Sequence, residues 1–193
     1  MRTARVFQAI VLLTAFASAS DWLCCAQSAS PSTSDQKIIS DFSKKAKDYI
    51  NKEHMLAQSQ MKPTSDVGRL QQARKQLREA VQQSRPNARQ GDFFNADTAN
   101  VFRKVLVDLL KGPEGKKIRT SLNHAEPGAS TEFKVNNEFP NQNGQPIQSV
   151  PPTVLKVLPE LPKGLEYCIA GRTLALRDSA ANLVVDYLPN AIP

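Results

Sequence analysis

The sequence predicts an α+β fold in which amphipathic N-terminal helices pack on a small antiparallel β-sheet at the C-terminus. Apolar residues recur at steps of three and four through the N-terminal part of the chain, as they do on the buried face of a helix. Short apolar runs separated by Gly, Asn and Asp follow in the C-terminal part and are typical of antiparallel strands. The chain of 193 residues is long enough to bury a core in one domain.

The first 26 residues have the layout of a secretory signal peptide. Arg2 and Arg5 give a positive start. The apolar run from Val6 to Ala17 is shorter than the roughly 20 residues that a membrane-spanning helix needs. Cleavage is expected after Ala26, with Ala19 as the alternative site. The sequence therefore predicts a protein that is exported to the periplasm or secreted, without a transmembrane segment in its mature chain.

The cysteines fit this interpretation. Cys24 and Cys25 leave with the signal peptide, and neither is preceded by the small residue that a lipidated cysteine requires. Cys168 then remains alone in the mature chain, so no internal disulfide can form. Because Cys168 lies in a strand-like run, we expect a buried side chain rather than a reactive thiol.

Residues 27–34 are rich in Ser and are expected to be a flexible leader, after which residues 35–193 form a single domain. The first helix is expected from Asp35 to Met61, where apolar residues fall on one stripe. The second helix is expected from about Val67 to Ser84. Pro63 separates the two, because proline removes a helical hydrogen bond and clashes with the preceding turn.

The third helix, from about Thr98 to Lys111, has the strongest amphipathic pattern in the chain. Gly112-Pro113 ends it and begins a short fourth helix from Glu114 to Leu122, because proline suits a first helical turn. Between the second and third helices lies the aromatic pair Phe93-Phe94. We expect this pair to plug the core from the side.

The helical part of the domain covers residues 35–123, and a β-rich part covers residues 129–193. Alternation from Thr131 to Phe139 predicts one additional strand, and Thr153 to Leu158 is expected to form a short helical turn. The uninterrupted Leu183-Val184-Val185 predicts burial on both faces of the last strand. The remaining residues are expected to form a three-stranded meander with strands Leu165–Ala170, Thr173–Arg177 and Leu183–Leu188.

The C-terminal segment carries a set of proline and turn motifs: Val150-Pro151-Pro152, Leu158-Pro159, Leu161-Pro162, Leu165-Glu166-Tyr167, Gly171-Arg172, and Asp178 with Ala181-Asn182-Leu183-Val184-Val185-Asp186. With these motifs, and with a weaker likeness over Arg89 to Phe94 and Phe102 to Leu110, the chain resembles a group of exported proteins of soil bacteria. The resemblance implies export and brings no activity with it. The group often has arginine where this chain has Cys168, which argues against a catalytic role at that position.

The charge distribution suggests a binding surface. The formal net charge is +7, and the stretch from Asp66 to Arg119 holds 12 Lys and Arg against 6 Asp and Glu. A basic surface on an exported protein favours an anionic partner, either a cell-envelope polymer or lipid headgroups, whereas export argues against nucleic acid. The simpler alternative is that these side chains only solvate the outer faces of the helices. The candidate binding residues are Arg69, Arg74, Lys75, Arg78, Lys104, Lys111, Lys116, Lys117 and Arg119.

Asp178 and Asp186 are the candidate catalytic residues, because they flank the second turn of the predicted meander. Two carboxylates can perform general acid–base catalysis or bind a cation. Aspartate is also an ordinary turn residue whose side chain bonds to local backbone, so a structural role is the alternative. The sequence contains no Gly-x-Ser-x-Gly, His-Glu-x-x-His or Cys-x-x-Cys motif, and neither a metal nor a cofactor is expected.

Three functional hypotheses follow. The first is an exported, non-enzymatic binding protein that contacts an anionic envelope component through its basic helices. The alternative is an envelope hydrolase that uses Asp178 and Asp186. A third hypothesis, an assembly factor that pairs through its C-terminal strand, depends on the apolar character of that strand.

Overall fold

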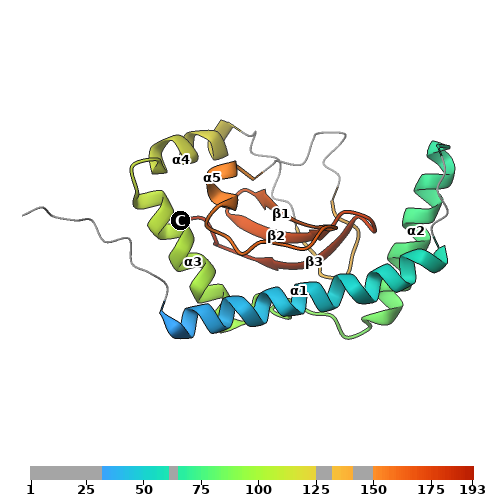
Figure 1. Ribbon diagram of the computed structural model, residues 1–193. Coiled ribbons are helices and arrows are strands. Elements are labelled where there is room, and N and C mark those ends of the chain that lie inside the picture. Colours follow the sequence, from blue (N-terminus) through green and yellow to red (C-terminus); the bar gives the residue numbers. More distant parts are fainter. Residues whose placement is uncertain (1–31, 61–64, 125–131, 141–149) are drawn as a thin grey trace, which may run out of the picture. The chain divides into compact units, whose positions relative to one another are not determined.

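A computed structural model of the chain, shown in Figure 1, describes four stretches: residues 32–60, 65–124, 132–140 and 150–193. The predicted signal peptide and most of the predicted leader lie outside the described residues. The described residues all belong to one compact unit, Pro31–Pro193. Within these stretches, no helix combines the length and the apolar character needed to cross a membrane.

The helices of the described residues are α1 (Thr33–Gln60), α2 (Val67–Ser84), α3 (Ala96–Lys111), α4 (Gly115–His124) and α5 (Pro152–Leu155). Side-chain N-caps define the first residues of α2 and α3. The Asp66 side chain accepts a hydrogen bond from the N–H of Arg69 before α2, and the Asn95 side chain accepts one from Thr98 before α3. Each predicted helix is present, with ends that agree or differ by a few residues.

The C-terminal segment forms an antiparallel sheet of three strands in the order β1 (Leu165–Ala170), β2 (Thr173–Asp178) and β3 (Leu183–Leu188). Gly171 and Arg172 make the two-residue turn between β1 and β2. Gly171 has a φ of 57°, which glycine adopts without steric cost at the first position of such a turn. Together with the helices, this sheet confirms the predicted α+β class.

The additional strand predicted from Thr131 to Phe139 does not form in residues 132–139. These residues make a turn around Asn136, whose φ is 64°, and a single isolated bridge joins Glu138 to Leu183. A left-handed residue interrupts the extended backbone that a strand requires. Alternation in the sequence was therefore not sufficient to make this segment pair along its length.

A β-bulge in β3 determines which face of the sheet Asp186 occupies. Leu176 pairs with Asp186 whereas Arg177 pairs with Val184, so Val185 is an extra residue in β3. Val184 belongs to a small cluster on one face of the sheet, and Val185 packs in the main core on the other face. The bulge thus lets Asp186 follow Val185 onto the face that the helices cover.

The main core lies between this face of the sheet and the helices. Phe42 of α1 contacts Phe94 and Phe102, with ring centroids 5.7 Å and 5.0 Å away. Phe93 and Phe94 are each 4% exposed, which confirms that the aromatic pair plugs the core. Figure 1 shows α1 running along the sheet, with α3 and α4 toward one end of the sheet and α2 toward the other.

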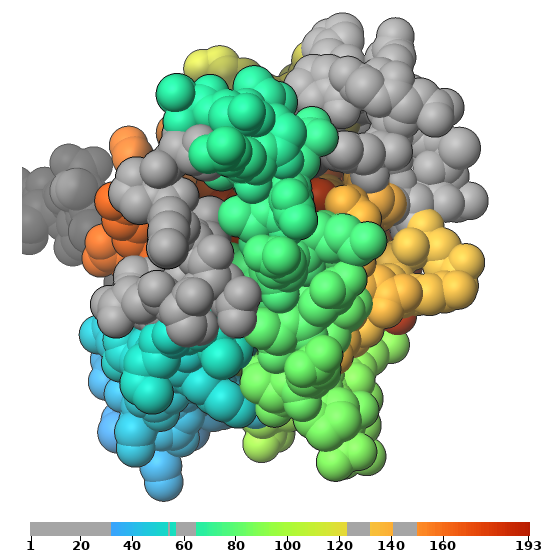
Figure 2. Space-filling model, turned by 90° about the vertical axis from the view of Figure 1, so that its right-hand side faces the viewer, coloured from blue at the N-terminus to red at the C-terminus, as the bar shows by residue number. Residues whose placement is uncertain are grey.

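The opposite face of the sheet carries a smaller buried cluster. Cys168 belongs to this cluster, which confirms its predicted burial, and Leu183, Val184 and Val185 are each 0% exposed, which confirms burial on both faces of β3. In Figure 2 residues 132–140 lie beside α2, where Arg78 pairs with Glu138. The other members of the cluster are Phe133, Phe139 and Ala175.

Candidate functional site

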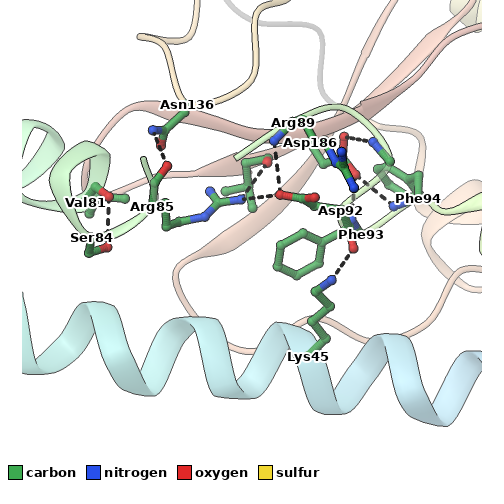
Figure 3. Close-up of polar contacts among 12 residues, drawn as sticks. Lys45, Val81, Ser84, Arg85, Arg89, Asp92, Phe93, Phe94, Asn136 and Asp186 are labelled. Carbon is green, nitrogen blue, oxygen red and sulfur yellow. Dashed lines mark hydrogen bonds and ion pairs between the residues drawn. The ribbon is translucent and has the colours of Figure 1, made fainter. Parts of the chain in front are cut away.

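Asp186, one of the two candidate catalytic residues, fastens the connector between α2 and α3 to the sheet. Its Oδ2 accepts hydrogen bonds from the N–H groups of Phe93 (2.7 Å) and Phe94 (2.8 Å), which lie beside it in Figure 3. Its Oδ1 accepts one from the N–H of Gly91 (3.1 Å). Burial raises the pKa of the Asp186 carboxyl, and these donors oppose the shift. Because backbone donors occupy both oxygens, the carboxyl is positioned as a structural anchor.

Asp178, the other candidate, ends β2 and closes the turn that follows. Its Oδ1 accepts hydrogen bonds from the N–H groups of Ala180 and Ala181, both at 2.9 Å, which is the ordinary way for aspartate to stabilise a turn. Its Oδ2 accepts a hydrogen bond from the hydroxyl of Tyr49 in α1, also at 2.9 Å. The two carboxyls therefore make separate buried contacts, and the geometry favours the structural alternative for both.

Glu53 of α1 is a buried carboxyl that the sequence pattern does not single out. It lies one helical turn after Tyr49 and is 3% exposed, and neither side-chain oxygen has a hydrogen-bond partner among the described residues. Burial, and then the charge of Asp178, raises the pKa of Glu53 to about 7, while Arg85 opposes the shift. In the sequence, Glu53 is visible only as a polar residue on the apolar stripe of the first helix.

Arg85 follows α2 and places a cation close to these carboxyls. It donates through Nη2 to the carbonyl of Val185 (3.3 Å) and forms an ion pair with Asp92 (3.8 Å), toward which it points in Figure 3. Its guanidinium lies 5.2 Å from the ring centroid of Tyr49 and 5.9 Å from that of Phe93. Within the described residues, Nη1 has no hydrogen-bond partner. Arg85 thus offsets part of the buried negative charge.

The nine candidate binding residues lie on three helices: Arg69, Arg74, Lys75 and Arg78 on α2, Lys104 and Lys111 on α3, and Lys116, Lys117 and Arg119 on α4. Several of them have acidic partners, in the ion pairs Lys75–Glu79 (4.0 Å), Arg78–Glu138 (3.0 Å), Lys104–Asp35 (3.1 Å) and Lys117–Glu114 (3.3 Å). Because α2 and α4 lie toward opposite ends of the sheet in Figure 1, the structure does not bring all nine residues to one surface.

A smaller group stays together where α3 ends and α4 begins. We call it the α3–α4 corner, and its members, all exposed, are Lys111, Lys116, Lys117 and Arg119. Ile118 points into the core and is 3% exposed, so the basic residues beside it face outward. Gly115 lets the two helices approach closely, because a Cβ there would overlap the backbone carbonyl of Leu110. The corner is therefore a basic surface on tightly packed helices.

A groove of about 660 Å³, here called the β1 groove, lies between β1 and the segment that precedes it. The Tyr167 hydroxyl donates to the carbonyl of Pro159 (3.0 Å), which ties β1 to the opposite wall. The sequence shows the prolines of that wall but not the groove, because the wall and β1 meet only in the tertiary structure. Its apolar lining is formed by Val150, Leu155, Leu158, Leu161, Leu165 and Tyr167.

Cys168 is the cysteine that borders the β1 groove, and its thiol is a weak nucleophile. Burial raises the pKa of this thiol to about 11, so the thiol stays protonated near neutral pH. Over the stretches that the structure describes, no group of three or more His, Cys, Asp or Glu residues is arranged to hold a metal ion.

No family model matches the chain, and neither the curated proteins nor the solved structures give a significant match. The functional assignment accordingly depends on the geometry of the described residues. The corner and the groove are two surfaces that the described residues offer to a partner.

Proposed function

We propose that the protein is an exported, non-enzymatic binding protein that associates with a polyanionic component of the cell envelope. The α3–α4 corner carries this proposal. Lys111, Lys116, Lys117 and Arg119 are all exposed within the nine residues 111–119, where Glu114 is the single acidic residue. Such a group attracts phosphate or carboxylate groups that are repeated along a polymer or over a membrane surface.

The strength of such an attraction depends on salt. A basic residue held close to an anionic lipid surface contributes about 1 kcal/mol, and this attraction falls off within a Debye length. The Debye length itself shortens from about 10 Å at 0.1 M salt to about 3 Å at 1 M salt. The corner side chains are exposed to solvent, so salt reaches them freely. Association through the corner should therefore weaken steeply as salt is added.

The alternative function, an envelope hydrolase that uses Asp178 and Asp186, has weaker support. A general base needs a lone pair that can reach the proton it removes. The oxygens of Asp186 accept backbone N–H groups, and those of Asp178 accept two backbone N–H groups and a tyrosine hydroxyl. Catalysis would require both carboxyls to leave contacts that close a turn and anchor a connector.

Co-sedimentation with isolated cell envelopes tests the proposal. Residues 27–193 should pellet with envelopes at roughly 0.05 M salt and stay in the supernatant at about 0.5 M salt, because screening weakens surface charge interactions. A corner variant with Lys116→Gln, Lys117→Gln and Arg119→Gln should lose most of the low-salt pelleting. Envelopes depleted of anionic polymer and vesicles of anionic lipid then distinguish the two sources of negative charge.

The matched control removes the same number of charges from the other end of the sheet. It carries Arg69→Gln, Arg74→Gln and Lys75→Gln, three exposed residues of α2. This variant should pellet nearly as well as the unmodified chain. Equal losses in the two variants would assign binding to net charge rather than to the corner, and no pelleting at either salt concentration would contradict the proposal.

A further inference from the structure

The β1 groove lies along an unpaired edge of the sheet. The strand order leaves β1 with one neighbour, β2. The carbonyl of Gly164 accepts a hydrogen bond from the N–H of Ser179 (2.9 Å). This bond shows which residues of β1 form hydrogen-bonded pairs with β2. Hydrogen-bonded pairs alternate along antiparallel strands, so Glu166 and Cys168 bond toward β2. Tyr167 lies between these two residues, so its N–H and C=O must point away from β2.

These two backbone groups of Tyr167 have no hydrogen-bond partner in the described part of the chain. By contrast, the N–H of Leu165, which points the same way, donates to the carbonyl of Pro162 (3.1 Å). Tyr167 as a whole residue is 8% exposed, and it lines the groove. Most backbone groups in native proteins are paired, so an unpaired donor and acceptor side by side offer a hydrogen-bonding site that the described residues do not fill.

The opposite wall of the groove is poorly equipped to supply that partner. Pro159 lies on this wall, and proline has no N–H to donate to the carbonyl of Tyr167. What the wall offers is apolar surface, with Leu155 46% exposed beside the opening. The volume of about 660 Å³ falls within the range of roughly 300–1,000 Å³ that is typical of ligand sites.

Residues of both charges lie at the rim of the β1 groove. Lys156 and Glu160 line the groove, are exposed, and form no ion pair among the described residues. Glu166 and Arg177, by contrast, already pair with each other across β1 and β2 at 3.5 Å. A ligand that carries both a positive and a negative charge fits Lys156 and Glu160 better than a fatty acyl chain does. A fatty acyl chain would also leave the backbone N–H and C=O of Tyr167 without hydrogen bonds.

We propose that the β1 groove binds an extended peptide segment. One peptide residue exchanges both backbone hydrogen bonds with Tyr167, as the residues of an antiparallel hydrogen-bonded pair do. Its apolar side chains lie on the groove lining around Leu155, and flanking charged residues meet Lys156 and Glu160. This site is separate from the α3–α4 corner, so either proposal can fail without the other.

A designed peptide tests the site directly. The probe is acetyl-Lys-Leu-Val-Leu-Glu-amide, added to the ¹⁵N-labelled protein and followed by two-dimensional NMR. We expect saturable binding with a Kd below about 1 mM and a downfield shift of the Tyr167 amide proton. The same peptide with an N-methyl group on its central valine cannot donate to the Tyr167 carbonyl, and its Kd should rise at least about tenfold, which is the cost of about one hydrogen bond.

Two exposed apolar residues of the same segment provide matched variants. Leu155→Lys places a charge in the groove and should weaken peptide binding about tenfold. Val157→Lys changes a residue that is 38% exposed and outside the groove lining, so it should leave the Kd unchanged. The proposal is overturned if the Tyr167 amide shows no saturable shift, if the N-methyl peptide binds equally well, or if decanoate binds more tightly than the peptide.

Discussion

At the scale of single residues, the buried carboxyls of Asp186 and Glu53 differ in their hydrogen bonding. Asp186 accepts hydrogen bonds from the connector between α2 and α3, so its lone pairs are satisfied. Glu53 is equally buried, and neither of its oxygens has a partner among the described residues. A buried carboxylate without donors is costly, which is why burial raises the pKa of Glu53 to about 7. The fold therefore carries a destabilising charge above neutral pH.

The pH dependence of stability follows from the direction of this shift. The folded pKa of Glu53 is above its ordinary value, so the folded state binds the proton more tightly than the unfolded chain does. The resulting loss of stability develops as the pH rises from about 4.5 to about 7 and is complete above that. Glu53→Gln keeps the side chain neutral at every pH. The variant should be about 3 kcal/mol more stable than the unmodified chain at pH 8, and this difference should shrink to about 1 kcal/mol at pH 5.

Urea unfolding at a series of pH values measures this difference. Asp48→Asn, on the exposed side of the same helix, serves as the control and should change stability little at any pH. A difference between Glu53→Gln and the unmodified chain that stays constant from pH 5 to pH 8 would show that the Glu53 carboxyl is not shifted.

At the scale of elements, the junction of α3 and α4 depends on one small residue. Gly115 begins α4 and is buried where the two helices meet. An added Cβ there would overlap the backbone carbonyl of Leu110, and backbone cannot move aside as a flexible side chain can. The same contact holds the basic side chains of α4 beside Lys111, so this packing also shapes the proposed binding surface.

Gly115→Ala should therefore destabilise the protein by about 3 kcal/mol, as measured by urea unfolding followed by circular dichroism at 222 nm. Gly68→Ala, in the first turn of α2, is the control. There a Cβ would meet only a side-chain oxygen of Asp66, at 3.3 Å, and alanine favours helix by up to about 1 kcal/mol. Similar losses of stability in both variants would contradict the role assigned to Gly115.

At the scale of the whole molecule, one hydrophobic cluster joins the helices to the sheet. Phe42 of α1 and Phe102 of α3 belong to the same cluster as Leu176 of β2. Phe102 also lies 6.2 Å from the ring of Tyr167 in β1. Neither layer buries its apolar face without the other, so the helices and the sheet should unfold together.

Thermal unfolding followed by two probes tests this coupling. Far-UV circular dichroism reports mainly the helices, and near-UV circular dichroism reports Tyr49, Tyr167 and Tyr187, two of which lie in the sheet. The two midpoints should coincide, and Phe102→Ala should lower both by the same amount, at a cost of about 3–5 kcal/mol. Loss of the helical signal at a lower temperature than the tyrosine signal would indicate two independent units.

The sequence by itself determined the helices and the three strands of the sheet. The bounds predicted for α2, β1 and β3 agree with the structure because periodic apolar residues, caps and turn residues act over a few neighbouring positions. Within the strand predicted from Thr131 to Phe139, residues 132–139 do not form a strand, because strand pairing depends on a distant partner and Asn136 adopts a left-handed conformation.

Only the tertiary structure decided how the functional candidates are arranged. The sequence named nine basic residues but not their separation on α2 and α4, since charge carries no information about which helix faces point the same way. The bulge at Val185 directs Asp186 to the connector, and burial isolates Glu53. The β1 groove likewise forms from segments whose contact depends on the packed core. Local chemistry fixed the elements of this protein, and long-range packing fixed its surfaces.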